Sequence, residues 1–275
     1  MQKIALIIGI TGQDGAYLAR YLLNYGYEIY GTTRDSQICD LSRLERLGIK
    51  NDIKILSLAL NDFRSVLKVI SHVNPDEIYN LAGQTSVGLS FDQPIEAMDS
   101  IANGTLNLLE VIMYFNKNIK FFNAGSSESF GNTQNFSANE DTKFRPRSPY
   151  AVAKSTAAWH VSTYRDSYNL FACTGYLSNH ESTLRRDRFV TKKIINGVKN
   201  IKSGKLNKLQ IGNIDIYRDW GWAPKYVEAM YLMLQNSSPK DYIIATGKTK
   251  SLRFFVEYTF KLANLPVEKY LEISD

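Results

Sequence analysis

The fold is decided by the opening stretch, residues 4–15, which read Ile4-Ala5-Leu6-Ile7-Ile8-Gly9-Ile10-Thr11-Gly12-Gln13-Asp14-Gly15. The first five residues form a short continuous apolar run, which is typical of a strand buried on both faces of a parallel sheet. Three glycines then follow at GxxGxxG spacing and lead into a helical pattern at residues 16–25. A glycine-rich turn directly after the N-terminal strand, opening a helix, indicates dinucleotide binding.

The three glycines have separate roles in such a turn. Gly9 permits the tight turn itself, Gly12 lets the backbone approach a pyrophosphate, and Gly15 allows the helix to pack closely on the strand. The helix N-terminus adds N–H donors and a favourable dipole for an anion. We therefore expect a nicotinamide dinucleotide at this turn, bound by Gly9, Thr11, Gly12, Gln13, Asp14 and Gly15.

Strands and helices continue to alternate along the chain. Strands are predicted at 27–33, 53–58, 77–81, 119–124 and 170–175, with helices at 62–73, 95–115 and 148–167. This spacing indicates βαβ units and an α/β fold, a doubly wound parallel sheet of the Rossmann type over residues 1–175. The rhythm loosens over residues 176–275, where helices are predicted at 189–203 and 224–234. We expect this part to be a smaller C-terminal lobe, interleaved with the sheet.

The residues after the second strand bear on the choice of cofactor. An acidic side chain at this point favours a free ribose 2′-hydroxyl, whereas Arg favours a 2′-phosphate. The chain has Arg34 followed by Asp35, so NADP and NAD are both open, as is a plain solvated turn. Arg34 comes first and favours NADP. The small residues around Leu81 and Ala82, at the end of the strand 77–81, predict a backbone that passes close to the cofactor.

A tyrosine and a lysine are spaced by four residues on the helix that Ser148 and Pro149 begin. Tyr150 and Lys154 therefore lie on one face of that helix, and a neighbouring ammonium lets a phenol act as a base near neutral pH. The strand 119–124 brings Ser126 and Glu128 to the carboxyl edge of the sheet, where α/β sheets bind ligands. Ser126 can there hydrogen-bond the hydroxyl that Tyr150 deprotonates.

These residues carry a resemblance to a known family. Thr11-Gly12, Asn80-Leu81-Ala82, Ser126, Tyr150 and Lys154 resemble the extended short-chain dehydrogenase/reductase superfamily. Within it, the chain resembles the GDP-mannose 4,6-dehydratase family along nearly its whole length. The supporting blocks are GITGQDGAY (9–17), RSPYAVAK (147–154), NHES (179–182), FVTKK (189–193), RDWG (218–221) and YVEAM (226–230). Glu128 separates these dehydratases from the epimerases of the superfamily, which generally carry a small residue there.

The resemblance implies oxidation, elimination and reduction on one sugar. Tyr150 takes the C4 hydroxyl proton while hydride leaves C4, and Glu128 removes the C5 proton and assists the loss of water from C6. Hydride then returns to C6.

The resemblance also places Asn179, Val190, Lys193 and Arg218 around the nucleotide of a GDP-sugar. Arg218 is the best diphosphate ligand because its fork matches phosphate geometry. An internal ion pair between Arg218 and Asp219 is an alternative that does not exclude this role.

Other activities stay open at this point. A GDP-linked heptose would undergo the same chemistry, whereas a 4-reductase or epimerase of a GDP-sugar would have no use for Glu128. A non-catalytic cofactor-binding paralogue is the remaining alternative, against which the intact catalytic set argues. The chain also departs from the family: Thr183 replaces a usual Pro, and residues 58–60 lack an Asp that contacts adenine in many relatives. Relatives usually continue past Asp275, so the lobe is expected to be incomplete.

Composition excludes several classes of protein. The 275 residues are 44% hydrophobic and 22% charged, in the ordinary globular range. The 33 Lys and Arg against 27 Asp and Glu leave a net charge of +6. This charge is scattered along the chain, which favours an anionic small molecule over nucleic acid. No apolar run reaches the roughly 18 residues of a membrane span, and Met1-Gln2-Lys3 leads into a strand without the pattern of a signal peptide.

The sequence also gives expectations about bound metal, cellular location and assembly. Cys39 and Cys173 are too few and too far apart for a disulfide framework or a metal site, so no metal is expected. A cytoplasmic location is expected because neither a membrane span nor a signal-peptide pattern is found. The superfamily resemblance implies a homodimer through the helices at 95–115 and 150–167. The loop 34–43 would extend this to a homotetramer.

Overall fold

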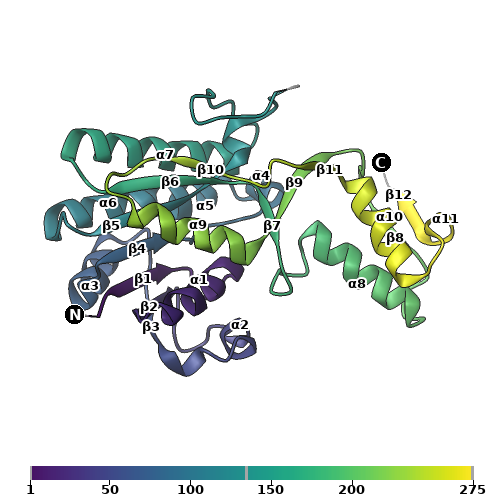
Figure 1. The fold of residues 1–275 in the computed structure, drawn as a ribbon, viewed down its shortest axis with the longest axis horizontal. Helices are drawn as coiled ribbons and strands as arrows, with labels where there is room; N and C mark the ends of the chain where they lie inside the picture. The colour runs from purple at the N-terminus through teal and green to yellow at the C-terminus, as the bar shows by residue number, and fades with distance from the viewer. Residues whose placement is uncertain (1, 134–135, 274–275) are drawn as a thin grey trace. The chain divides into compact units, whose positions relative to one another are not determined.

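A seven-stranded parallel sheet dominates the computed structural model, which describes residues 2–133 and 136–273 (Figure 1). The strand order is β10-β6-β5-β4-β1-β2-β3, and every neighbouring pair is parallel. The strands are β1 (Ile4–Ile8), β2 (Glu28–Thr33), β3 (Ile53–Ser57), β4 (Glu77–Asn80), β5 (Lys120–Ser126), β6 (Ala172–Leu177) and β10 (Tyr242–Ile244). The predicted doubly wound sheet is confirmed.

Helices cover both faces of this sheet (Figure 1). On one face, α1 (Gln13–Asn24) packs beside α9 (Ala223–Gln235); on the other lie α3 (Phe63–Val73), α6 (Gly104–Phe115) and α7 (Pro149–Tyr168). The core under α3, α6 and α7 holds alternate residues of the strands, such as Leu6, Ile8 and Phe121, all fully or almost fully buried. Burial on both faces explains why β1 reads as a continuous apolar run.

The predicted helix 95–115 is divided into three parts. A four-residue helix α5 (Pro94–Ala97) is followed by a π-helical stretch η2 (Met98–Asn103) and then by α6. The hydroxyls of Ser100 and Thr105 donate to the carbonyls of Glu96 and Ile101 at 2.7 and 2.6 Å. Such side-chain bonds compete with the regular backbone ladder and bend helices. Shorter elements that the sequence pattern did not predict are α2 (Ser42–Arg46), η1 (Lys50–Asp52), α4 (Val87–Asp92) and η3 (Ser127–Phe130).

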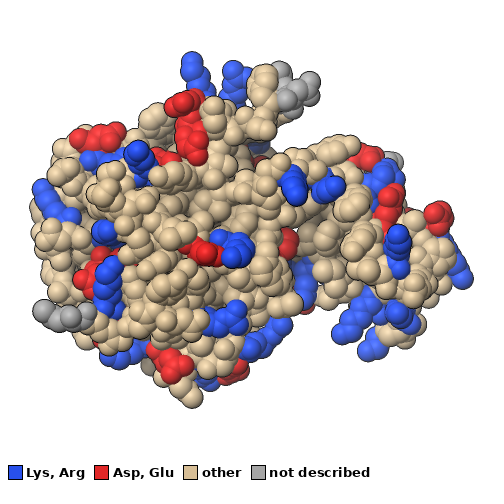
Figure 2. Space-filling model, viewed as in Figure 1, with Lys and Arg blue, Asp and Glu red and all other residues tan. Residues whose placement is uncertain are grey.

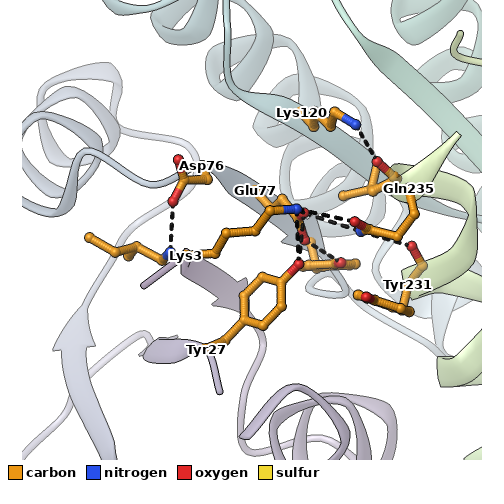
Figure 3. Close-up of polar contacts among 10 residues, drawn as sticks. Lys3, Tyr27, Asp76, Glu77, Lys120, Tyr231 and Gln235 are labelled. Atoms are coloured by element: carbon orange, nitrogen blue, oxygen red, sulfur yellow. Dashed lines mark hydrogen bonds and ion pairs between the residues drawn. The ribbon is translucent and has the colours of Figure 1, made fainter. Parts of the chain in front are cut away.

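A buried carboxylate ties the amino end of the sheet together (Figure 3). Glu77 of β4 is 1% exposed and accepts hydrogen bonds from Lys3 Nζ (3.0 Å), Tyr27 OH (3.0 Å), Tyr79 OH (2.8 Å) and Gln235 Nε2 (3.1 Å). These donors satisfy the charge and connect β4 to α9 and to the residues just before β1 and β2. Burial, reinforced by the Glu77 charge, raises the pKa of both phenols well above the ordinary value, so both stay protonated donors.

The chain forms two compact units. Unit 1 comprises residues 1–177 and 223–244 and contains the seven-stranded sheet; unit 2 comprises residues 178–222 and 245–275. The loss of strand–helix alternation predicts one boundary after residue 175, whereas the chain passes from one unit to the other three times. Among residues 2–133 and 136–273, no helix has both the length and the apolar character to cross a membrane.

Unit 2 is built from two small sheets and three helices in its described residues. The first sheet has the order β11 (Thr249–Ser251), β9 (Tyr217–Trp222), β7 (Asn179–Glu181), and the second pairs β12 (Leu271–Ile273) with β8 (Leu209–Ile211). The helices are α8 (Val190–Lys202), α10 (Leu252–Ala263) and α11 (Val267–Tyr270), and α8 and α10 share an apolar core. The three-residue strands β7, β11 and β12 were not predicted, because such short segments carry too little periodicity. The twelve-residue helix α10 was not predicted either.

Candidate active site

The glycine-rich turn joins β1 to α1 with almost no spare room. Gly9 has φ +89°, and a Cβ on it would lie 3.0 Å from the carbonyl oxygen of Leu81 and 3.1 Å from Ala82 Cα. A Cβ on Gly15 would lie 2.5 Å from the carbonyl oxygen of Gly9. The predicted reasons for glycine at both positions are therefore confirmed, and the turn lies against the end of β4. Gly12 is the N-cap of α1 and makes no side-chain cap hydrogen bond.

The first turn of α1 is also linked to the catalytic helix. Gln13 is buried, and its Nε2 donates to Asp14 Oδ1 at 3.2 Å. The negative charge of Asp14 raises the pKa of Lys154 on α7, against the larger effect of burial. The candidate cofactor turn and the candidate catalytic helix are thus electrostatic neighbours within unit 1.

Arg34 directly follows β2 and forms an ion pair with Glu96 of α5. Its side chain is 80% exposed. The next residue, Asp35, accepts a hydrogen bond from the Gln37 N–H at 2.8 Å, so its carboxylate closes a local turn. Asp35, the candidate acidic determinant of cofactor choice, is therefore hydrogen-bonded to nearby backbone. Arg34, the basic candidate, is paired with a residue of α5.

Arg43 is a residue that the sequence analysis missed. It lies on α2, its side chain is 11% exposed, and its Nη1 donates to the Thr11 carbonyl at 3.3 Å. Arg43 therefore supports the glycine-rich turn from the side of α2. No local pattern could have indicated this, because α2 has only five residues and the contact joins positions 32 residues apart.

Helix α7 begins as predicted and carries the Tyr–Lys pair. The Ser148 Oγ accepts from the Ala151 N–H at 3.1 Å, and Pro149 occupies the first turn. The Lys154 ammonium is 5.9 Å from the ring centroid of Tyr150 and donates to the Ala124 carbonyl of β5 at 2.7 Å. Lys154 is buried, and burial lowers its pKa from 10.5 to about 8. A lysine held in this way is a fixed cation beside a partly exposed phenol.

Ser126 and Glu128 lie where β5 ends. Ser126 is the last residue of the strand and the N-cap of the 3-10 turn η3, and its Oγ accepts from the Glu128 N–H at 3.2 Å. Ser126 is buried, whereas Glu128 is partly exposed. Since Lys154 is bonded to Ala124 of the same strand, α7 with Tyr150 and Lys154 lies beside the strand end that carries Ser126 and Glu128.

The four predicted substrate residues all belong to unit 2. Asn179 pairs in register with Trp220, and Arg218 lies two residues before Trp220, so the side chains of Asn179 and Arg218 share a face. Trp220 and Val190 pack against the same apolar core, and Lys193 follows Val190 by one turn of α8. Lys193 is exposed. Figure 2 shows basic side chains gathered over α8, which carries Lys192, Lys193, Lys199 and Lys202.

The residues of unit 1 fit a dinucleotide. Backbone at Gly9 and Gly15 is so close to its neighbours that a methyl group would not fit, which leaves a backbone-lined turn at the N-terminus of α1. The N–H groups and the dipole at a helix N-terminus favour a phosphate. The turn lies at the carboxyl edge of the sheet, between the ends of β1 and β4, as expected for this class of ligand.

Fold and site together define an enzyme of the extended short-chain dehydrogenase/reductase class, with a Rossmann-type sheet, a glycine-rich turn and a Tyr–Lys pair after β5. The chain belongs to the GDP-mannose 4,6 dehydratase family, whose sequence model matches residues 6–273. It is 43% identical to GDP-mannose 4,6 dehydratase 1 of Arabidopsis thaliana, over 99% of this chain and 78% of the relative. It is 46% identical to the GDP-mannose 4,6 dehydratase of Cricetulus griseus, over 94% and 72%. The predicted family membership is confirmed.

Solved structures agree on the fold. The dTDP-glucose 4,6-dehydratase of Bacillus anthracis, determined in complex with NAD, superposes with a TM-score of 0.85. That match covers 99% of this chain and 84% of the other at 20% identity.

Proposed function

We propose that this chain catalyses the 4,6-dehydration of GDP-mannose to GDP-4-keto-6-deoxymannose. The observation that carries the proposal is the position of Glu128, two residues after the end of β5, beside Ser126 and at the same sheet edge as Tyr150 and Lys154. Oxidation alone needs only the serine, tyrosine and lysine. Loss of water from C5 and C6 also needs a base for the C5 proton, and Glu128 is the carboxylate available there.

The roles of the side chains follow from their surroundings. Tyr150 takes the proton of the C4 hydroxyl, assisted by the Lys154 cation, while Ser126 hydrogen-bonds the same oxygen. The bound nicotinamide supplies hydride acceptance at C4 and hydride return at C6. The new 4-keto group acidifies C5–H, and Glu128 removes that proton and gives it to the departing C6 hydroxyl, which leaves as water. When hydride reaches C6, C5 takes up a proton, which the proton that Tyr150 took from the C4 hydroxyl balances. One carboxylate thus serves as base and then as acid.

The cofactor of this proposal is NADP. A nicotinamide dinucleotide fits the turn of Gly9, Gly12 and Gly15, and a 20% identical neighbour of the same fold was solved with NAD. The preference for NADP is supported by Arg34, which follows β2 and can turn from Glu96 to a 2′-phosphate. It is further supported by Asp35, whose carboxylate is occupied by its own turn.

The substrate is bound, in this proposal, by Asn179, Val190, Lys193 and Arg218 of unit 2, with Arg218 at the diphosphate. The shared strand face of Asn179 and Arg218 supports this assignment. The alternative, an internal ion pair between Arg218 and Asp219, is less favoured, because the Asp219 carboxylate already accepts hydrogen bonds from Ser178, Thr246 and Lys248.

We also propose that the protein is a cytoplasmic homo-oligomer. Both cysteines, Cys39 and Cys173, are free thiols, as is usual in a reducing compartment. Large apolar side chains are exposed on α5 to α7, among them Ile95 (75%), Tyr114 (76%) and Trp159 (63%), and such a surface is typical of a protein interface. Light scattering after size-exclusion chromatography distinguishes monomer, dimer and tetramer.

The test of the activity is incubation of the purified protein with GDP-mannose and catalytic NADP. We expect mass spectrometry to show conversion to a product lighter by one water. Accumulation of NADPH in proportion to product would instead identify a dehydrogenase. Cofactor binding without any turnover would identify a non-catalytic protein.

Substitution of the base adds a second test. Glu128→Gln keeps the shape of the side chain but removes its basicity, so we expect dehydration to fall by a factor of at least about 100. The matched control is Glu45→Gln, which neutralises a surface glutamate paired with Lys50. Full activity in Glu128→Gln would show that another group removes the C5 proton.

A further inference from the structure

Two basic side chains lie opposite each other in the antiparallel pair of β9 and β11. Arg218 pairs in register with Lys250, between the pairs Tyr217–Ser251 and Asp219–Thr249. Directly opposite residues of an antiparallel pair point to the same face with their Cβ atoms about 5 Å apart. Like charges in this position are unfavourable, and an anion bound between them would relieve the repulsion.

The register of this pair is fixed from the other face of β9. Asp219 points away from the face of Arg218 because successive side chains alternate. Its carboxylate accepts from the backbone N–H groups of Thr246 at 3.0 Å and Lys248 at 3.2 Å, and from Thr246 Oγ1 at 3.0 Å. The hydroxyl of Ser178 donates to the same carboxylate at 3.2 Å. One side chain therefore holds the turn that precedes β11, and a slip of one residue would break these bonds.

Lys250 is exposed and is available to a ligand. Within the described part of the chain it forms no ion pair, and its ammonium lies 5.0 Å from the ring centroid of Phe254 on α10. An exposed cation–π contact contributes only about 0.5–1 kcal/mol, so the ammonium can leave the ring for a phosphate at little cost. Arg218, by comparison, is partly buried, and its Nη1 donates to the Tyr217 carbonyl at 2.8 Å.

We propose that Lys250 is a second cation for the diphosphate of the nucleotide sugar, set beside Arg218 by the pairing of β9 with β11. This rests on the proposed function, which assigns the diphosphate to Arg218. A diphosphate carries negative charge on both phosphates, and the two cations are suited to share it. The planar fork of Arg218 binds two oxygens, while the ammonium of Lys250 acts as a point charge.

The test is a calorimetric titration of the purified full chain with GDP and, separately, with guanosine. The variants are Lys250→Ala and the matched control Lys261→Ala, which removes an exposed lysine from α10 in the same unit. We expect Lys250→Ala to weaken GDP binding about tenfold, the effect of one charged hydrogen bond, and to leave guanosine binding unchanged. Lys261→Ala should bind both as the wild type does. An unchanged melting temperature of Lys250→Ala confirms that the variant is folded.

The possible results distinguish a failure of the Lys250 proposal from a failure of the proposed function. If the wild type binds GDP and Lys250→Ala binds it as tightly as Lys261→Ala does, Lys250 has no role at the diphosphate and the proposed function stands. If Lys250→Ala weakens guanosine and GDP equally, the lysine acts on the shape of the lobe and the inference is wrong. If the wild type binds NADP but not GDP, the assigned substrate is wrong and the inference falls with it.

Discussion

Replacement of Lys154 by methionine should make the protein more stable and almost inactive. The Lys154 side chain is 6% exposed, its ammonium donates to the Ala124 carbonyl at 2.7 Å, and burial lowers its pKa from 10.5 to about 8. A lowered lysine pKa means that the native state binds this proton less well than the unfolded state does. Below pH 8 the charged form therefore weakens the fold, and stability from this group rises as pH increases from about 8 to 10.5.

The size of the effect follows from the two pKa values. A difference between 10.5 and about 8, at about 1.4 kcal/mol per pKa unit, costs the native state about 3 kcal/mol at pH 7. Methionine has nearly the same length and no charge, but it leaves the Ala124 carbonyl without its donor, which costs about 1–2 kcal/mol. We expect a net gain in the free energy of unfolding of about 1–2 kcal/mol at pH 7, and a melting temperature higher by about 3–6 °C.

Activity should move in the opposite direction. Without the cation beside Tyr150, the phenol loses the group that favours its ionised form, and the rate of dehydration should fall by a factor of about 100 to 10,000. The control is Lys120→Met, the same lysine-to-methionine change at the first residue of β5, away from the strand end that Lys154 contacts. There the ammonium also donates to a main-chain carbonyl, that of Leu234, at 2.6 Å. Lys120→Met should keep wild-type activity.

The predicted gain in stability is tested by thermal unfolding at pH 7 and pH 10. The predicted loss of activity is tested by the mass-spectrometric assay of water loss. The stability advantage of Lys154→Met should be present at pH 7 and absent at pH 10, where the native wild type no longer carries the charge. An advantage of equal size at both pH values would refute the role of desolvation. Wild-type activity in Lys154→Met would refute the role of the cation.

Four further predictions concern other parts of the molecule. Gly15→Ala places a Cβ 2.5 Å from the Gly9 carbonyl oxygen, so NADPH affinity in a fluorescence titration should fall at least about tenfold, with a loss of about 1–3 kcal/mol in stability; unchanged affinity contradicts the close packing. Glu77→Ala removes the acceptor of four donors and should cost about 3 kcal/mol in urea unfolding; a loss below about 1 kcal/mol contradicts the network's role. Arg34→Ala should lower the ratio of NADP to NAD affinity about tenfold, and an unaltered ratio assigns the 2′-phosphate elsewhere. Asp219→Asn should raise the Kd for GDP about tenfold through loss of the β11 anchor; wild-type binding would show that the register survives without it.

The main features of the fold and the residues of the candidate site could be predicted from local patterns. Apolar runs of about six residues, separated by helical periods, indicate a parallel sheet because both faces of each strand are buried. The glycines at 9 and 15 follow from what a backbone turn demands, and the close contacts at both positions confirm this. Tyr150 and Lys154 share a helix face by spacing alone, and the family was recognisable from blocks of contiguous residues.

Contacts between distant residues could be known only from the folded structure. The pairing of Lys250 with Arg218, the anchoring of residues 246–248 by Asp219 and the support of Thr11 by Arg43 join segments about 30 residues apart. The π-helical break in the predicted helix and the return of residues 223–244 to unit 1 are of the same kind. Periodicity reports whether a side chain is buried but not what it is buried against. The partner of a charged side chain is set by strand register and helix packing, which exist only once the chain has folded.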